Sequence, residues 1–266
     1  MKSRLLTWLE YIPIRIILFF VRLLPYRLAV KIGGFLGRFI YYIPSLKKTV
    51  NQGLNIAYAN EKTPLEIKKT AKNVFIHFGK ICFEVMKMLS FKPKHIIRHV
   101  EFVNKEQFLK DYNQGKGMIL ICCHLGNWEL LGAGWSHAGI HADVIVRPLD
   151  NVLLDKYVER MRESFGMRVI PRKEVFKKGK DTIKQSRALV FLMDQNTVTN
   201  PLFVPFFRKE ASTVTGPAIF ARKYHCPVGF AYSVRINNSL HRLFYQPIEI
   251  DRTIDDRKEF IRIHTE

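Results

Sequence analysis

The sequence has 266 residues, of which 47% are hydrophobic, and this composition excludes a disordered or fibrous protein and allows a sizeable core. Lys and Arg number 43 and Asp and Glu number 23, so the formal charge of +20 predicts an anionic partner: nucleic acid, an anionic membrane or a phosphorylated lipid. The four cysteines have no C-x-x-C spacing, which argues against a zinc site and predicts reduced thiols on the cytosolic side of a membrane.

Residues 1–45 form the first predicted segment, which is far more apolar than the rest yet contains regularly spaced cations. Arg15 and Arg22 are seven residues apart, as are Lys31 and Arg38, so each pair falls near one stripe of a helix. No uncharged run approaches the length of about 20 residues that an ordinary membrane-spanning helix needs. We therefore expect helices that lie in the membrane interface, with their cations at lipid phosphates. Buried helices with snorkelling arginines and a single spanning anchor are the alternatives, whereas a cleaved signal peptide fits poorly.

A long helix is predicted from Thr63 to Leu89, because apolar residues recur there at helical spacing after a capped start, Thr63-Pro64-Leu65-Glu66. Beyond it, short apolar runs alternate with helical stretches, which predicts an α/β fold with a mixed, largely parallel central sheet flanked by helices. No linker rich in Gly, Ser or Pro divides the chain after residue 100, so we expect a membrane-associating segment at 1–45 and one further domain at 46–266. The strands are predicted at 117–123, 142–147, 188–193 and 226–234, and the helices between them at 127–138, 151–165, 173–186 and 213–224.

Three polar residues, His124, Arg147 and Asp194, each follow a predicted strand. Parallel sheets bind ligands beyond the carboxyl ends of their strands. We therefore expect these three side chains to converge at one edge of the sheet.

Glu129 lies five residues after His124. If Gly126 and Asn127 turn the chain from strand to helix, Glu129 can fold back to the imidazole, fix its tautomer and raise the basicity of the other ring nitrogen. This predicts His124 as a general base and Glu129 as its orienting acid, with a structural histidine as the alternative. Gly126 allows close approach of substrate, and N–H groups at the start of the next helix, near Asn127, would help to hold an oxyanion.

A rival motif, GWSHA at Gly134 to Ala138, resembles a nucleophile elbow. Such an elbow requires a strand that runs directly into its first glycine. The preceding residues, NWELLGA, instead have the character of a helix, so Ser136 and His137 are predicted to be helical residues rather than a nucleophile and its base.

At HLGNWE, residues 124–129, the sequence resembles the lysophospholipid acyltransferase superfamily, and specifically its lipid A biosynthesis branch, the late lauroyl and myristoyl transferases of lipopolysaccharide assembly. The N-terminal apolar segment followed by NQGLNIAYAN is also similar to this branch. Further similar segments are RPLDN at 147–151, ERMRESFGMRVIPR at 159–172, DQN at 194–196, FVPFF at 203–207 and ASTVTGPAIFARKYHCPV at 211–228.

The resemblance implies a glycerolipid acyltransferase-like fold and transfer of a fatty acyl group from acyl carrier protein, or less often coenzyme A. The implied acceptor is a hydroxyl of a lipid A precursor or a similar anionic glycolipid, at the cytoplasmic face of the cell inner membrane. The acyl thioester is a donor substrate, and neither a cofactor nor a metal is implied.

The resemblance also implies roles for individual residues. The family's base falls on His124 and its orienting acid on Glu129. Arg162 matches a family arginine associated with the active site. Arg147, Asp194 and Gln195 match positions that line the same cleft.

Two departures from the family pattern are visible. Arg208 stands where the family commonly has glycine, beside the FVPFF segment. The resemblance also implies a further helix and a Trp/Arg-rich motif after the last residues of this sequence, EFIRIHTE, so the sequence is C-terminally short relative to the family.

Two other classes of function are the alternatives. One is a non-catalytic, membrane-associated scaffold on an acyltransferase fold. The other is a basic nucleic-acid-binding protein, but the cations are spread along the whole chain and no recognition motif is present, so we expect no nucleic-acid partner.

Overall fold

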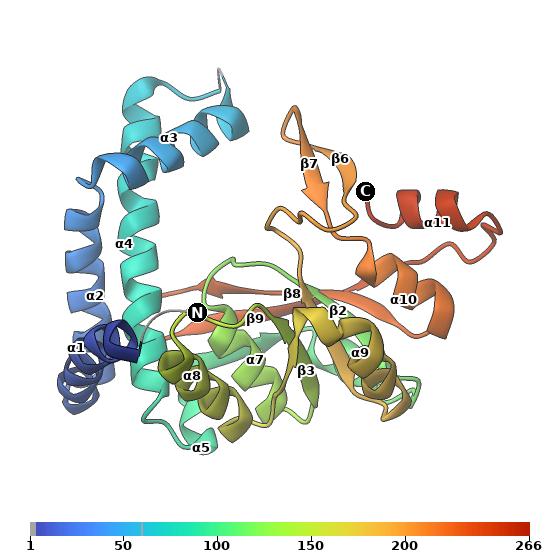
Figure 1. Ribbon diagram of the computed structural model, residues 1–266, viewed down its shortest axis with the longest axis horizontal. Coiled ribbons are helices and arrows are strands. Elements are labelled where there is room, and N and C mark those ends of the chain that lie inside the picture. The colour runs from blue at the N-terminus through green and yellow to red at the C-terminus, as the bar shows by residue number, and fades with distance from the viewer. Residues whose placement is uncertain (1–3, 60) are drawn as a thin grey trace.

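The computed structural model describes residues 4–59 and 61–266 and shows a seven-stranded sheet flanked by helices (Figure 1). The strand order is β1-β9-β8-β2-β5-β3-β4, and all neighbours are parallel except β8 and β9. The predicted α/β fold with a mixed, largely parallel sheet is confirmed. The strands are β1 (Val100–Val103), β2 (Met118–Cys122), β3 (Ala142–Val146), β4 (Arg168–Pro171), β5 (Ala188–Leu192), β8 (Val228–Arg235) and β9 (His241–Ile248).

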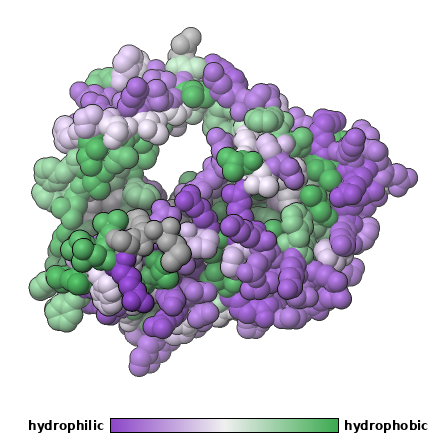
Figure 2. Space-filling view, viewed as in Figure 1, coloured by the Kyte–Doolittle hydropathy of each residue, from purple (hydrophilic) through white to green (hydrophobic). Residues whose placement is uncertain are grey.

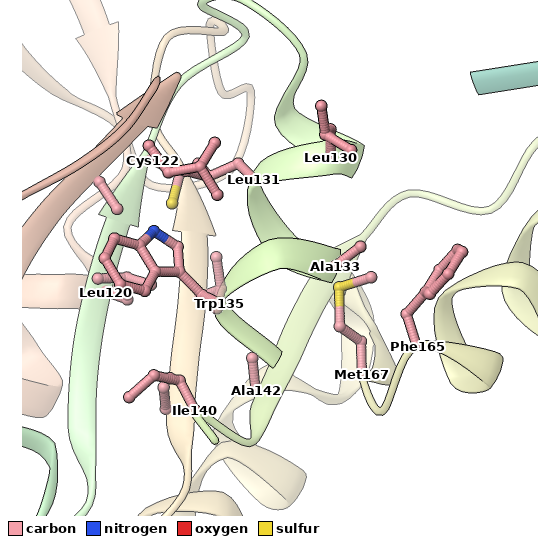
Figure 3. Close-up of a cluster of buried hydrophobic side chains, with 14 of the residues drawn as sticks. Leu120, Cys122, Leu130, Leu131, Ala133, Trp135, Ile140, Ala142, Phe165 and Met167 are labelled. Carbon is pink, nitrogen blue, oxygen red and sulfur yellow. The ribbon is translucent and has the colours of Figure 1, made fainter. Parts of the chain in front are cut away.

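Helices cover both faces of the sheet because the central strands are apolar on both sides. Along β2, Leu120 and Cys122 pack into a cluster with side chains of α6, α7 and α8, shown in part in Figure 3, while Ile119 packs on the opposite face with side chains of α9 and α10. Trp135 of α7 is among the buried residues of the first cluster. These helices are α6 (Lys105–Tyr112), α7 (Trp128–His137), α8 (Val152–Ser164), α9 (Val175–Lys184) and α10 (Gly216–Tyr224).

The remaining elements are short. A separate antiparallel hairpin forms between β5 and α10, so the helix predicted from residue 213 begins three residues later, after the second hairpin strand. At the hairpin turn, Arg208 lies 3.4 Å from the carboxylate of Glu61. These elements are α5 (Pro93–Ile96), the 3-10 helices η1 (Ile97–His99) and η2 (Arg172–Glu174), β6 (Leu202–Phe206), β7 (Lys209–Thr213) and α11 (Arg257–Ile263).

The long helices of the N-terminal part are α1 (Arg4–Leu23), α2 (Tyr26–Ile40), α3 (Pro44–Tyr58) and α4 (Pro64–Met88). The predicted capped start of α4 is confirmed, because Thr63 and Glu66 each accept a hydrogen bond from the other's backbone N–H.

Helices α2 and α4 cross in backbone contact. A Cβ atom added at Gly33 would lie 2.4 Å from the carbonyl oxygen of Gly79, and one added at Gly37 would lie 2.3 Å from that of Phe75. Any side chain larger than hydrogen at these positions would push the two helices apart.

Two cations of α1, Arg15 and Arg22, contact other parts of the protein. Arg22 donates to the carbonyl oxygen of Leu89 at 2.9 Å, and the guanidinium of Arg15 lies 4.7 Å from the centre of the Tyr157 ring. Lys87 of α4 donates to two carbonyls at the end of α1, at 2.7 and 2.8 Å. The contact of these cations with lipid phosphates stays a prediction, and Arg15 remains exposed.

The outer face of α1 and α2 is apolar, and Figure 2 shows it as a hydrophobic area on one side of the molecule. Within the described residues, no helix combines the length and the apolar character that crossing a membrane requires. The division of the chain at residue 45 stays a prediction, and residues 1–3 of that segment lie outside the described part. The large apolar side chains exposed on this face include Leu5, Leu9, Ile12, Ile16, Phe19, Phe20, Leu23, Phe35 and Phe39.

Candidate active site

His124 and Asp194 form a hydrogen-bonded pair at the carboxyl edge of the sheet. His124 follows β2 and Asp194 follows β5, and these strands are hydrogen-bonded neighbours. The ring Nδ1 of His124 lies 2.8 Å from Asp194 Oδ1, and its backbone N–H donates to Oδ2 at 2.9 Å. Of the three residues predicted to converge at this edge, the structure brings these two together.

The pair fixes the tautomer of His124. Partial burial by itself raises the pKa of Asp194, but the hydrogen bonds from His124 outweigh it and hold this pKa below its ordinary value. An ionised carboxylate only accepts hydrogen bonds, so Nδ1 donates to it and the proton of the neutral ring is on Nδ1. The Nε2 lone pair is therefore free to accept a proton, as a general base requires.

Glu129 does not orient His124, contrary to the prediction. It lies in the first turn of α7 and is buried against α8, where Arg162 donates to it from Nε at 3.0 Å and from a terminal nitrogen at 2.5 Å. Burial lowers the pKa of Arg162, but its hydrogen bonds to Glu129 outweigh burial and keep this pKa above its ordinary value. The arginine occupies both carboxylate oxygens, and the acid bound to the His124 ring is Asp194.

Asn127 and Gly126 have structural contacts, and their role beside the substrate stays a prediction. Asn127 is fully buried, and its backbone N–H, one of the N–H groups near the start of α7, donates to the Ser233 hydroxyl at 2.8 Å. Its side chain accepts from the N–H of Leu130 at 2.9 Å, which caps α7. Gly126 has φ +63°, and a Cβ there would lie 2.1 Å from the Ser233 carbonyl oxygen, so glycine serves a tight turn against β8.

The remaining predicted residues are divided between the site and its rim. Gln195 lines a groove together with His124. Arg147 follows β3 at the same sheet edge, but it is largely exposed and lies 3.5 Å from the carboxylate of Asp150. Ser136 and His137 lie inside α7 as predicted, which leaves no nucleophile elbow at GWSHA.

The groove beside His124 has a volume of about 530 Å³. Trp128, whose ring meets that of His124 edge to face at 4.7 Å, lies on the same wall as Gln195. The opposite wall is one face of α4, and Figure 2 shows the molecule hollowed between α4 and the sheet. The α4 residues that line it recur at helical spacing: Thr70, Asn73, Val74, His77, Phe78 and Ile81.

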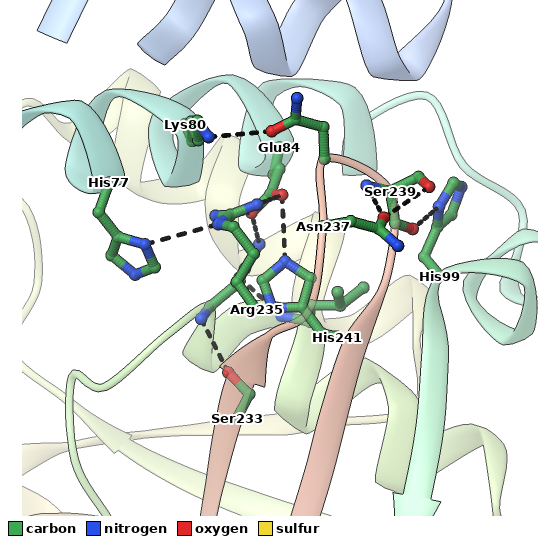
Figure 4. Close-up of polar contacts among 12 residues, drawn as sticks. His77, Lys80, Glu84, His99, Ser233, Arg235, Asn237, Ser239 and His241 are labelled. Atoms are coloured by element: carbon green, nitrogen blue, oxygen red, sulfur yellow. Dashed lines mark hydrogen bonds and ion pairs between the residues drawn. The ribbon is translucent and has the colours of Figure 1, made fainter. Parts of the chain in front are cut away.

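A buried polar network behind this wall joins α4 to the sheet (Figure 4). Glu84 is fully buried and accepts hydrogen bonds from both terminal nitrogens of Arg235, from Nε2 of His241 at 3.1 Å and from the Asn127 amide at 3.0 Å. Burial alone raises the pKa of Glu84, but the hydrogen bonds from His241 and Arg235 outweigh it and lower this pKa to about 2. The network therefore fixes α4, the ends of β8 and β9 and the cap of α7 relative to one another.

Sequence reasoning missed Glu84, His77 and the wall of α4 as parts of the site. The sequence does place Glu84 on the inward-facing side of the predicted helix. A buried carboxylate needs cationic partners, so this position could have predicted a polar network.

The fold and this site define a class: an α/β protein with a carboxylate-steered histidine at the carboxyl edge of its sheet, beside a groove lined partly by apolar side chains. A family model described as bacterial lipid A biosynthesis acyltransferase matches residues 2–262. The chain therefore belongs to the bacterial lipid A biosynthesis acyltransferase family. A search of curated proteins found no match.

Proposed function

We propose that the protein transfers a fatty acyl group from a thioester donor to a hydroxyl of a lipid A precursor or a similar anionic membrane glycolipid. The observation that supports this most directly is His124, held by Asp194 through Nδ1 beside the groove. Membership of the family supports acyl transfer and a lipid A-type acceptor.

In the proposed reaction, the acceptor hydroxyl oxygen attacks the carbonyl carbon of the thioester while Nε2 of His124 takes the hydroxyl proton. The new C–O bond gives a tetrahedral intermediate, which collapses as the C–S bond breaks. The leaving thiolate takes the proton from the imidazolium, so the products are an ester and a free thiol. Asp194 stabilises the imidazolium while it exists.

Direct attack by the acceptor is supported by the inertness of the nearby side-chain nucleophiles. Cys123 is adjacent to His124 in sequence, but burial raises the pKa of its thiol. The Ser136 hydroxyl is buried inside α7. Neither group is prepared to form an acyl-enzyme intermediate.

We place the protein at the cytoplasmic face of the cell inner membrane. The exposed apolar face of α1 and α2 supports this proposal, because such a face binds the boundary between lipid headgroups and acyl chains. The excess of cations supports attraction to an anionic leaflet.

We propose acyl carrier protein as the donor, because η2 and α9 together offer a surface suited to an acidic partner. Lys173, Lys177, Lys180 and Lys184 follow one another at spacings of four, three and four residues and are exposed, and none has an ion pair within the described chain. The chain enters α9 from the carboxyl end of β4, the same edge that holds His124. Arg172 at this entrance donates to Thr197, in the loop that follows Asp194.

Charge reversal on this lysine stripe is expected to weaken use of the carrier-bound donor. The double variant Lys177→Glu/Lys180→Glu should raise KM for acyl carrier protein by roughly tenfold at low salt, since complementary charge steers association. With a neutral acyl-pantetheine donor, KM should stay unchanged. The matched control is Lys110→Glu/Lys116→Glu, which changes the charge equally on exposed lysines before the amino end of β2. Equal effects of the two double variants would contradict the proposed docking surface.

The proposed function is tested by mass spectrometry of total lipids from cells with and without the protein. We expect one lipid class to gain the mass of one acyl group when the wild-type chain is present, and no gain with His124→Ala. Fractionation of the same cells should place the protein with the membranes. An unchanged lipid profile with wild-type protein would favour the non-catalytic scaffold.

A further inference from the structure

A second histidine, His77, faces the same groove as His124. It lies on α4, among the side chains that form the wall opposite Trp128 and Gln195. The ring is partly exposed. The groove therefore has an imidazole on each side.

The environment of His77 fixes which of its nitrogens carries the proton. Arg235 lies with its Nε 3.5 Å from Nδ1 of His77, and a guanidinium has only donors. Nδ1 must then accept, so the ring proton is on Nε2. Glu84 holds the terminal nitrogens of the same Arg235, which keeps the guanidinium in place behind the ring (Figure 4).

His77 is also held in its neutral form. Burial and then the positive charge of Arg235 lower its pKa to about 4, although Glu84 acts in the opposite direction. The other charged or titratable groups that act on the ring are His241 and Lys80. At neutral pH the ring therefore keeps one N–H and no positive charge.

The two histidines consequently have opposite capacities. His124 has its proton on Nδ1 and a free lone pair on Nε2, whereas His77 has its lone pair occupied by Arg235 and its N–H on Nε2. Within the described chain, Nε2 of His77 has no hydrogen-bond partner. A neutral imidazole N–H can stabilise a developing oxyanion without delivering its proton.

We propose that His77 is a second catalytic residue, which donates a hydrogen bond from Nε2 to the thioester carbonyl oxygen. The inference rests on the proposed function. When the acceptor oxygen adds to the carbonyl carbon, the C=O electron pair moves to this oxygen, and His77 stabilises the resulting charge. When the C–S bond breaks, the pair returns to the carbonyl and the hydrogen bond weakens. His77 neither gains nor loses a proton in the cycle.

The test is the kinetics of His77→Phe and His77→Gln in the full chain, with Lys68→Ala as the control, an exposed residue of α4 that does not line the groove. His77→Phe keeps a ring but removes the donor, so kcat should fall by about 10²–10³-fold, while KM for both substrates changes little. His77→Gln, whose amide can donate, should be at least tenfold more active than His77→Phe, and Lys68→Ala should stay close to wild type. Equal activity of His77→Phe and wild type would overturn the inference.

A measurement independent of activity is the ¹⁵N NMR spectrum of the histidine rings. We expect the His77 signal to report a neutral ring with the proton on Nε2 at pH 7. A charged ring or a proton on Nδ1 would overturn the inference even if the variants lose activity. A wild-type protein that transfers no acyl group would overturn the proposed function, whereas an active wild type with a fully active His77→Phe overturns the role of His77 alone.

Discussion

Replacing His124 with Ala is expected to abolish acyl transfer, with a fall in kcat of about 10⁴-fold or more, because the hydroxyl proton then has no acceptor at the groove. The ring is partly exposed and its replacement leaves Asp194 at the surface, so folding should be retained. The measurement is transfer of a labelled acyl group to purified glycolipid, with circular dichroism as the check on folding. Transfer at the wild-type rate would rule out His124 as the base.

Two carboxylate variants separate the acid seen in the structure from the acid expected from the sequence. Asp194→Asn should lower kcat by about 10²–10⁴-fold while the protein stays folded, because an amide no longer stabilises the imidazolium or enforces the tautomer. Glu129→Gln leaves Arg162 partly buried without its counter-charge, so its first effect should be on stability. If Glu129→Gln lowers kcat at unchanged stability while Asp194→Asn does not, Asp194 is not the orienting acid.

Replacing Glu84 with Gln is expected to lower the free energy of unfolding by about 3–5 kcal/mol, because the cation of Arg235 remains buried without its counter-charge. Urea denaturation followed by tryptophan fluorescence measures this change. The matched control is Glu101→Gln, which removes a half-exposed ion pair with Arg242 on the neighbouring strand and should cost about 0–1 kcal/mol. Equal costs for the two variants would show that the buried network adds no stability.

The stability difference between wild type and Glu84→Gln has a defined pH dependence. The pKa of Glu84 falls from an ordinary 4.5 to about 2 on folding, so its ionisation contributes stability above about pH 4.5. This contribution is lost as the pH falls toward 2. The stability difference between wild type and Glu84→Gln should therefore be constant near neutral pH and shrink across that acidic range.

The parts of the fold with continuous apolar runs could be predicted from the sequence. Strands β2, β3, β5 and β8 lie within the predicted ranges to about two residues, because strands buried on both faces consist of such runs. The shorter strands β1 and β4 and the edge-side β9 were not predicted. Polar residues such as Arg168 in β4 and Arg242 in β9 interrupt their patterns.

The sequence could predict at which edge of the sheet the site residues lie, but not which of them contact one another. His124 and Asp194 could both be placed at one sheet edge from the strand ends alone. Their contact depends on β2 and β5 being neighbours, which local spacing does not reveal across 70 residues. Glu129 is near His124 in sequence, but the turn at Gly126 directs it to Arg162 instead.

The glycine crossing of α2 and α4 has a mechanical consequence. Since the two backbones touch at Gly33 and Gly79, a displacement of α2 toward α4 would push α4 with it. The outer side of α2 is the proposed lipid-facing surface, and the inner side of α4 is one wall of the groove. If the helix pair rests in a bilayer, its depth there would set the height of the groove above the lipid acyl chains.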